Sequence, residues 1–435
     1  MKVFFDTIGC RLNQAEIERY AAQFAALGHE IVPDAESADI AVVNTCSVTA
    51  AAASDSRGKV RSAAKGGAQV VVTGCWSTME PEIAAAMEGV SHVVPNAEKD
   101  DLTAAVLGLE KADFDTEPLK RVVLPGVHAR TRAFIKIQDG CDNHCTFCVT
   151  HLVRGKARSV EKERVLHDVR SASSAGGKEI VLTGVNLGAW GLDLTPQAEL
   201  ADLIEFLLKE TDIPRIRLSS LESWNLSDRF LHLWEDPRMC PHFHLPLQSG
   251  SDSVLKRMAR RTTLAEFRRL VDVAMSVNPA FAITTDVIAG FPGETEEEFA
   301  QTMAFAASIP FAGGHIFPYS PRPGTPAARM KDQVPKAVQK DRAKRLRDLF
   351  ETKTEQFEKS FIGSIRPVLW ESAQKLPNGQ WEVHGLSDNY LTVKTVFPEP
   401  VRNRIDAVRI TDRQDGKLIG EVIPGFREEG DDGRI

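Results

Sequence analysis

The chain has 435 residues, more than one ordinary hydrophobic core organises, so its length predicts two to four domains. No apolar run approaches the roughly 20 residues of a membrane span, and the N-terminal residues read as a strand rather than a signal peptide. We therefore expect a cytoplasmic protein with no membrane segment. The net charge of -7 excludes a globally basic nucleic-acid-binding chain, so any RNA contact requires a local basic surface.

The first segment, residues 1–125, repeats one pattern three times: an apolar strand, a small residue, a cysteine and a helix-like stretch. The expected strands are 3–8, 40–43 and 70–72, and the cysteines that follow them are Cys10, Cys46 and Cys75. Apolar strands alternating with helices predict a parallel sheet covered on both faces. Ligands gather outside the carboxyl ends of such strands. Asn13 and Glu16 predict a capping box for the first helix.

A second, longer βα series is expected over residues 126–357. Its strands are expected at 134–138, 179–183, 215–218, 242–247, 282–288 and 314–318. Six alternating units predict a partial (β/α)6 barrel. Thr263 with Glu266, and Thr295 with Glu298, predict capping boxes at the starts of two of its helices.

The third segment, residues 358–426, contains short β-prone runs at 366–371, 381–384, 390–395 and 406–413, separated by proline and glycine turns. This pattern predicts a small β-barrel. Trp370, Trp381 and Tyr390 either fill its core or stack on unpaired bases. Residues 427–435 are expected to form a frayed acidic tail.

The most specific chemical signal is a CxxxCxxC directly after the first expected barrel strand, formed by Cys141, Cys145 and Cys148. Three thiolates can ligate three irons of a cubane cluster, and no fourth cysteine follows nearby, so one iron keeps an open position. The alternative is a zinc site with His144 or His151 as the fourth ligand.

This cysteine motif at the first strand of a partial barrel resembles the radical S-adenosylmethionine (SAM) superfamily. The resemblance implies that the open iron binds the amino and carboxylate groups of SAM, and that reduction splits SAM to a 5′-deoxyadenosyl radical. Motifs at later strand ends also resemble the family, and they imply SAM or substrate contacts at Gly184, Glu222, Gln248 and Asp286.

The spaced cysteines in Gly-Cys-Arg-Leu-Asn-Gln, Asn-Thr-Cys-Ser-Val-Thr and Thr-Gly-Cys-Trp would each, taken alone, be ordinary buried core residues. Together these motifs resemble the N-terminal domain of the methylthiotransferase family, which implies a second, auxiliary [4Fe-4S] cluster on Cys10, Cys46 and Cys75. The terminal barrel resembles an RNA-binding TRAM domain. Cys240, the seventh cysteine, is interpreted as structural.

The family resemblance implies an enzyme that adds a methylthio group to C2 of a modified adenosine, using two SAM molecules per turnover, a sulfur source and an electron donor. Its expected partner is a tRNA anticodon stem-loop. The opening motif and the stretches 315–320 and 324–329 look most like the branch acting on N6-threonylcarbamoyladenosine. The alternatives are isopentenyladenosine tRNA, a ribosomal-protein aspartate, and a non-catalytic RNA-binding protein with structural metal.

Two groups of basic residues have two possible interpretations: a solvent-exposed helix face, or a surface that binds the phosphates of RNA, called here the phosphate track. The first group is Lys256, Arg257, Arg260, Arg261, Arg268 and Arg269, and the second is Arg154, Lys156 and Arg158. The phosphate track is the preferred interpretation because the second group follows the CxxxCxxC loop at the expected barrel mouth.

Overall fold

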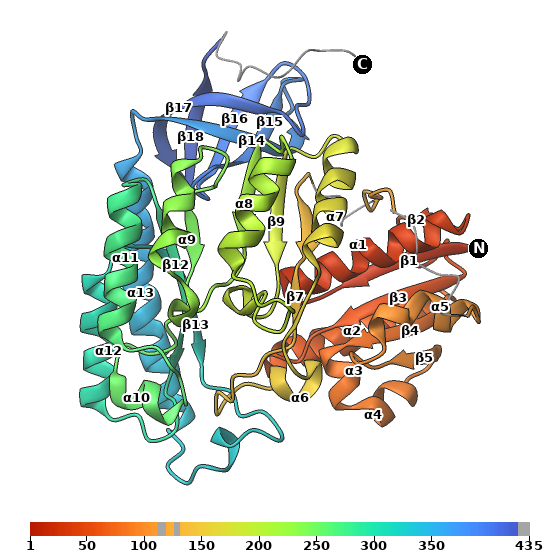
Figure 1. Ribbon diagram of the computed structural model, residues 1–435, viewed down its shortest axis with the longest axis horizontal. Helices are drawn as coiled ribbons and strands as arrows, with labels where there is room; N and C mark the ends of the chain where they lie inside the picture. Colours follow the sequence, from red (N-terminus) through yellow and green to blue (C-terminus); the bar gives the residue numbers. More distant parts are fainter. Residues whose placement is uncertain (111–118, 126–130, 425–435) are drawn as a thin grey trace.

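The computed structural model describes residues 1–110, 119–125 and 131–424. Figure 1 shows an N-terminal α/β part in red and orange beside a central βα part, with a small β part in blue packed on one end of the central part. This arrangement confirms the expected fold class. The boundary expected after residue 125 borders residues outside these ranges, and the tail expected at 427–435 lies entirely outside them. No helix within the described ranges is long and apolar enough to cross a membrane.

The N-terminal part is a five-stranded parallel sheet with the order β2-β1-β3-β4-β5. Its strands are β1 (Lys2–Thr7), β2 (Glu30–Val32), β3 (Ile40–Thr45), β4 (Gln69–Gly74) and β5 (Val90–Val94). The three expected strands are the central ones, and β3 is buried along its whole length. The edge strands β2 and β5 were missed because their partly exposed sequences lack a continuous apolar run. The flanking helices are α1 (Arg11–Ala26), α2 (Ala50–Lys65), α3 (Cys75–Met79), α4 (Pro81–Ala85) and α5 (Leu102–Leu107).

The capping box expected from Asn13 and Glu16 is wrong. Helix α1 begins at Arg11 with Cys10 as its N-cap, so Asn13 and Glu16 lie inside the helix. Both side chains are buried, and they make hydrogen bonds to other parts of the chain instead of to the helix terminus. An Asn followed three residues later by Glu has the sequence pattern of a capping box. Here both side chains form hydrogen bonds with residues outside the helix instead.

The central part consists of two three-stranded parallel sheets, β10-β9-β6 and β11-β12-β13. Their strands are β6 (Ala133–Lys136), β9 (Glu179–Thr183), β10 (Arg215–Leu218), β11 (His242–His244), β12 (Ala282–Ala289) and β13 (Phe311–Pro318). Isolated bridges between Ile216 and Met239, and between Ser220 and His244, join the two sheets at β10 and β11. The strands therefore follow one another in chain order as a partial barrel, as expected.

Helices cover the outside of this partial barrel (Figure 1). They are α7 (Lys162–Ser174), α8 (Leu200–Glu210), α9 (Asp228–His232), α10 (Asp252–Arg257), α11 (Leu264–Val277) and α12 (Glu296–Ser308), whereas α6 (Thr150–Arg154) lies against α3 of the N-terminal part. Both capping boxes expected here are present, with Thr263 and Thr295 each accepting from the backbone N–H three residues later. A large apolar core fills the space between the strands and the helices.

Helix α13 (Lys336–Ser360) joins the central part to the C-terminal part and contributes to both cores. Leu346 and Phe350 belong to the central core, whereas Phe357 packs on the core of the C-terminal barrel. The Phe350 ring lies so close to Gly314 on β13 that a Cβ there would be 2.6 Å from the ring, so only glycine fits. The helix continues to Ser360, past the boundary expected at residue 357.

The C-terminal part is a closed β-barrel with the order β14-β15-β16-β18-β17. Its strands are β14 (Ile365–Lys375), β15 (Trp381–Ser387), β16 (Thr392–Phe397), β17 (Ile405–Gln414) and β18 (Lys417–Val422). Four of them match the expected runs, and β18 was missed. Trp370 is fully buried in the core and donates to Asp406 over 2.6 Å, and Trp381 packs against that core. Tyr390 does not fill the barrel core, because its side chain reaches out of the barrel to Arg11, and its stacking on a base stays a prediction.

Buried arginines of β10 tie the C-terminal barrel to the central strands. The Arg217 guanidinium binds the Glu179 carboxylate over 2.7 Å, and both side chains are fully buried. It also donates to the backbone carbonyls of Ser387 and Asp388 in the turn after β15. Although burial opposes its charge, the cations of Arg217, Arg215 and Arg132 lower the pKa of Glu179 to about 2. The barrel therefore rests on a charged group that has no access to water.

Replacing Arg217 with methionine removes the main cation from this site and leaves Glu179 buried with weaker compensation. We expect Arg217→Met to reduce the free energy of unfolding by about 3 kcal/mol. The matched control is Arg229→Met, which removes an exposed arginine bound to Asp202 and Glu205. Chemical denaturation should show a much smaller change for the control, and equal losses in the two variants would contradict the buried anchor.

Candidate functional site

The cysteines of the N-terminal part follow three adjacent parallel strands. Cys10 comes after β1, Cys46 directly after β3, and Cys75 directly after β4, and these strands are neighbours in the sheet. Parallel strands about 4.8 Å apart end at the same edge, so the three thiols lie at one place. We call Cys10, Cys46 and Cys75 the N-terminal trio.

Two glycines allow the loops of this trio to lie against one another. Gly9 has φ +104°, and a Cβ there would be 2.8 Å from the Cys46 sulfur. Gly74 has φ +98°, and a Cβ there would be 2.4 Å from the carbonyl oxygen of Thr45. A side chain at either position would meet both a strained backbone and a steric clash, so glycine before Cys10 and Cys75 is required for the approach.

The second group, Cys141, Cys145 and Cys148, lies on the loop between the short strand β7 (Gln138–Asp139) and α6. We call it the loop trio. The backbone N–H groups of Asn143 and Thr150 donate to the sulfurs of Cys141 and Cys148, each over 3.4 Å. Hydrogen bonds to sulfur are one of the means by which proteins tune iron–sulfur clusters.

The third sulfur of the loop trio has a buried arginine beside it. Arg260 Nη1 lies 3.8 Å from the Cys145 sulfur, and the arginine side chain is 2% exposed. The same guanidinium forms a two-pronged ion pair with Glu222, at 2.9 and 2.5 Å. Glu222 therefore fixes the orientation of a cation at the cysteine loop, which is the kind of geometry that a planar guanidinium favours.

The N-terminal trio also has polar neighbours that reach across to the central part. Asn96 Nδ2 lies 3.7 Å from the Cys75 sulfur and donates to the carbonyl of Val153 on α6 over 3.0 Å. The Cys10 thiol lies 3.5 Å from Asn13 Oδ1. Helix α6, which follows the loop trio, therefore packs against the N-terminal trio.

Arg154 at the end of α6 is the centre of this contact. It donates to Glu16 over 2.9 Å, to Asp139 over 3.0 Å and to Asn13 over 2.6 Å. Lys99 binds the same two carboxylates over 2.5 Å each. The side chains of Arg154, Glu16 and Asp139 are each only 3% exposed, so their charges are compensated by one another and not by water. We call these five residues the buried ionic cluster.

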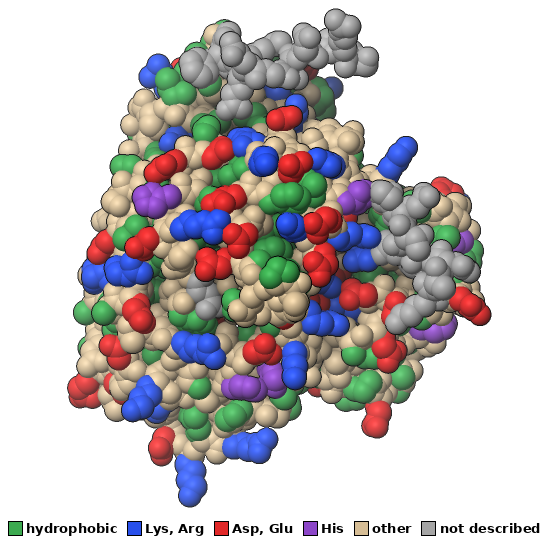
Figure 2. Space-filling model, in the orientation of Figure 1, with side chains coloured by type: hydrophobic (Ala, Val, Ile, Leu, Met, Phe, Trp, Pro, Cys, Tyr) green, Lys and Arg blue, Asp and Glu red, His purple; other side chains and the backbone are tan. Residues whose placement is uncertain are grey.

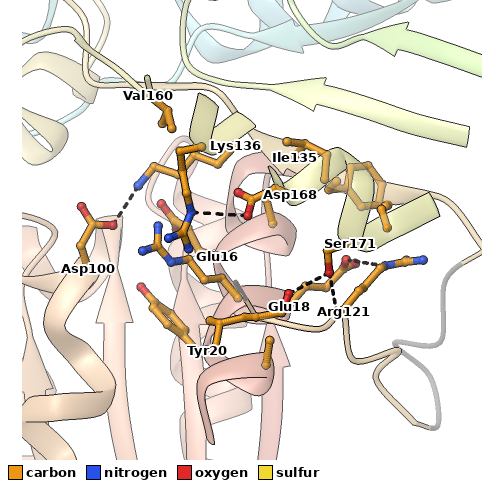
Figure 3. A pocket seen from close by; sticks show the side chains of 18 residues that line it. Glu16, Glu18, Tyr20, Asp100, Arg121, Ile135, Lys136, Val160, Asp168 and Ser171 are labelled. Atoms are coloured by element: carbon orange, nitrogen blue, oxygen red, sulfur yellow. Dashed lines mark hydrogen bonds and ion pairs between the residues drawn. The ribbon is translucent and has the colours of Figure 1, made fainter. Parts of the chain in front are cut away.

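The cluster continues to the surface between α1 and β6. Figure 3 shows Lys136 on β6 extending past Glu16 to Asp100, and the distance from its ammonium to that carboxylate is 3.1 Å. Lys136 also binds Asp139 over 3.2 Å. A small cavity of about 90 Å³ beside these side chains is lined by residues of α1, β6 and α7. Charged groups therefore contribute several of the contacts between the N-terminal and central parts.

The charge of Arg154 also acts on the N-terminal trio. Burial opposes that charge, but Cys75, Glu16, Asp139 and Cys10 together raise the pKa of Arg154 well above its usual value. Burial raises the pKa of Cys46 to about 11, and that of Cys141 to about 11. Such thiols are protonated at neutral pH, so metal binding has to displace their protons.

The described residues do not form a ready-made site for a single metal ion. Among the described residues, no three His, Cys, Asp or Glu side chains converge closely enough to hold one metal ion. A zinc ion needs its ligands at about 2.0–2.3 Å, so the arrangement does not favour the zinc alternative. His151 instead lies 3.2 Å from the Cys141 carbonyl, and the His144 ring packs against the His151 ring.

The residues expected to contact SAM have other partners. Glu222 binds Arg260, and Asp286 lies between His244 and His315 at 3.3 and 3.2 Å. A Cβ at Gly184 would be 2.9 Å from the Gln138 carbonyl, so packing alone explains this glycine.

Gln248 combines φ +68° with a backbone hydrogen bond to Asp286. A non-glycine residue in the left-handed region is uncommon and is found at functional sites. Contacts of Gly184, Glu222, Gln248 and Asp286 with SAM or substrate stay predictions.

The preferred phosphate-track interpretation is wrong for the buried arginines of both basic groups. Arg154 belongs to the buried ionic cluster, and Arg260 lies at Cys145. Arg257 and Arg269 pair with Glu298 and Asp228. Figure 2 shows basic and acidic side chains interspersed over the face it presents.

Sequence reasoning missed Arg154, Arg260 and Asn96 as neighbours of the cysteines. Arg154 lies six positions after Cys148, so its closeness to the loop trio was visible in the sequence, but its contact with the N-terminal trio was not. Cys240 is buried and far in sequence from both trios, in agreement with a structural role.

Comparisons with known proteins agree with this architecture. Residues 135–306 match the Radical SAM superfamily, and residues 2–95 match the Uncharacterized protein family UPF0004. A solved structure of the radical SAM methyltransferase TsrM from Kitasatospora setae superposes with a TM-score of 0.57 at 14% identity, covering 75% of this chain and 77% of that one. At this identity the superposition shows a shared fold.

Two curated relatives extend over most of the chain. The threonylcarbamoyladenosine tRNA methylthiotransferase MtaB of Thermotoga maritima is 37% identical, covering 85% of this chain and 86% of the relative. The tRNA-2-methylthio-N(6)-dimethylallyladenosine synthase of Geobacillus kaustophilus is 33% identical, covering 100% of this chain and 84% of the relative. Membership of the radical SAM superfamily implies SAM and a [4Fe-4S] cluster as cofactors. With both sequence domains and these relatives in agreement, the chain belongs to the methylthiotransferase family of radical SAM enzymes.

Proposed function

We propose that this enzyme adds a methylthio group to C2 of N6-threonylcarbamoyladenosine next to the anticodon of tRNA, and that it works in the cytoplasm. The observation that carries the proposal is the position of Arg154, which ends the helix after the loop trio and bonds to Asn13 and Glu16 behind the N-terminal trio. One residue thereby holds two cysteine groups next to each other, as transfer of sulfur to a radical site requires.

The loop trio is proposed to hold the cluster that binds SAM, and the N-terminal trio a second [4Fe-4S] cluster. When bound, SAM and these clusters supply the radical and the sulfur, chemistry that no side chain can supply. The chain itself provides the thiolates, the N–H donors to their sulfurs and the cations Arg154 and Arg260 beside them. A sulfur source and an electron donor are proposed as further partners.

The substrate assignment is supported by the relatives and by the opening motif. The Thermotoga maritima relative named for threonylcarbamoyladenosine is 37% identical, against 33% for the Geobacillus kaustophilus relative named for dimethylallyladenosine. The TRAM-like barrel is proposed to bind the anticodon stem-loop. We propose functional units of residues 1–125, 126–357 and 358–426, followed by the tail 427–435.

Nucleoside analysis of tRNA tests the substrate. We expect a strain lacking the gene to lose 2-methylthio-N6-threonylcarbamoyladenosine and to accumulate the unmethylthiolated nucleoside, as measured by mass spectrometry. The wild-type gene should restore the modification, and a Cys148→Ala gene should not. Loss of the isopentenyl analogue instead would replace the proposed substrate with the alternative one.

Iron analysis tests the two clusters separately. Anaerobically reconstituted enzyme should carry about eight irons per chain, and replacing either trio by alanine should leave about four. The control is Cys240→Ala, which removes a buried cysteine outside both trios and should keep the full iron content. If the wild-type enzyme carries only four irons, the second cluster is absent and the sulfur-transfer proposal fails.

Arg154→Gln tests the junction between the two cysteine groups. The substitution leaves the buried Glu16 and Asp139 short of a cation, so we expect a loss of about 3–5 kcal/mol in unfolding free energy. We also expect less iron on the N-terminal trio, because its loops lose a support. The control Arg158→Gln changes an exposed arginine four residues later and should alter neither quantity. Normal iron content and normal stability in Arg154→Gln would show that the buried ionic cluster is dispensable.

A further inference from the structure

A cavity of about 240 Å³ opens where all three parts of the molecule meet. Strands β11 to β13 form one side, the turn before β16 forms another, and Arg11 comes from the N-terminal part. The polar side chains that line it include Arg11, His244, Thr284, His315, Asn389 and Tyr390. This volume is far above the roughly 10–15 Å³ that a single water molecule needs, so the cavity can admit a polar substituent.

Arg11 is the residue next to Cys10, and its side chain is fixed in this cavity. Its Nη2 donates to the Tyr390 hydroxyl over 2.6 Å, and its guanidinium carbon lies 5.4 Å from the centre of the Tyr390 ring. Tyr390 in turn stacks on His242 at 4.2 Å between ring centres. A guanidinium has five N–H donors, and this tyrosine uses one of them.

The opposite wall carries two histidines held by one carboxylate. Asp286 accepts from His244 and from His315, at 3.3 and 3.2 Å. The hydrogen bond to Asp286 raises the pKa of His315, which favours the protonated ring. The other acidic side chain at the cavity, Glu358, binds Arg413 over 2.6 Å. The carboxylates at this site therefore already have cationic partners, whereas Arg11 is hydrogen-bonded to the Tyr390 hydroxyl.

We propose that this cavity is the subsite for a carboxylate on the N6 substituent of the substrate adenosine, with Arg11 and His315 as its specificity-determining residues. The inference rests on the proposed function, because the threonylcarbamoyl group carries a carboxylate and the isopentenyl group is an apolar hydrocarbon. Arg11 directly follows a cysteine of the N-terminal trio, so a substituent bound here belongs to a base held beside that trio. A planar guanidinium binds a carboxylate through paired N–H donors.

The test compares two synthetic anticodon stem-loops, one with threonylcarbamoyladenosine and one with its neutral carboxamide. Fluorescence anisotropy gives the Kd of each loop with the full-length reconstituted enzyme, and mass spectrometry gives the rate of methylthiolation. We expect the wild-type enzyme to bind the carboxylate loop about tenfold more tightly than the carboxamide loop. Arg11→Gln should reduce this ratio to about one by weakening the carboxylate loop only.

Three further variants separate recognition from loss of structure. Arg11→Lys should recover part of the ratio because it retains the positive charge. His315→Asn, far in sequence from every cysteine, should reduce the ratio in the same direction as Arg11→Gln. Arg61→Gln makes the same chemical change at an exposed position of α2 and should leave the ratio unchanged. Iron content is measured for each variant.

The outcomes distinguish the inference from the proposed function. Equal wild-type affinity for the two loops, or equal weakening of both loops by Arg11→Gln, would overturn the subsite. A wild-type preference for the carboxylate loop supports the subsite even if no methylthiolation of that loop occurs. In that case the proposed function would fall while the subsite stands, because the binding ratio does not depend on turnover.

Discussion

The structure depends on a set of charges that have no access to water. Arg154 of the central part and Lys99 of the N-terminal part each bind both Glu16, which belongs to the N-terminal part, and Asp139, which belongs to the central part. A buried charge without a partner costs several kcal/mol, so these groups are stable only when both parts are docked in one register. This requirement fixes the position of the N-terminal part on the central part. An apolar interface of the same area would tolerate small shifts between the two parts.

The same constraint organises the chemistry. Four of the five residues of the buried ionic cluster lie on α1 directly after Cys10 and on the two segments that flank the loop trio, so docking brings both cysteine groups together, and Lys99 follows β5. Asn96, which lies beside Cys75, donates a hydrogen bond to the Val153 carbonyl. Arg260 places a second cation at Cys145. Each trio thus has a buried arginine close to its sulfurs. Positive charge near thiolates favours the anionic form that binds iron.

The C-terminal barrel takes part in the site as well as in the fold. Arg217 anchors the turn after β15 to the central strands, and that turn holds Tyr390 against His242 and Arg11. A domain that resembles an RNA-binding module therefore also forms a wall of the cavity beside the N-terminal trio. Binding of an RNA stem by the barrel and entry of the N6 substituent into the cavity would be geometrically linked.

The sequence by itself determined the three central strands of the parallel sheet, the partial barrel and the two cysteine groupings. These features depend on apolar runs and on residues at strand ends, both of which are local in the chain. Only the tertiary structure decided that Asn13 and Glu16 face another domain, that Arg154 and Arg260 lie beside cysteines rather than in solvent, and that Tyr390 leaves its barrel. The physical reason is that a charged or polar side chain is satisfied by whichever partner the fold brings near, and that partner can be hundreds of residues away, as Arg11 and Tyr390 are.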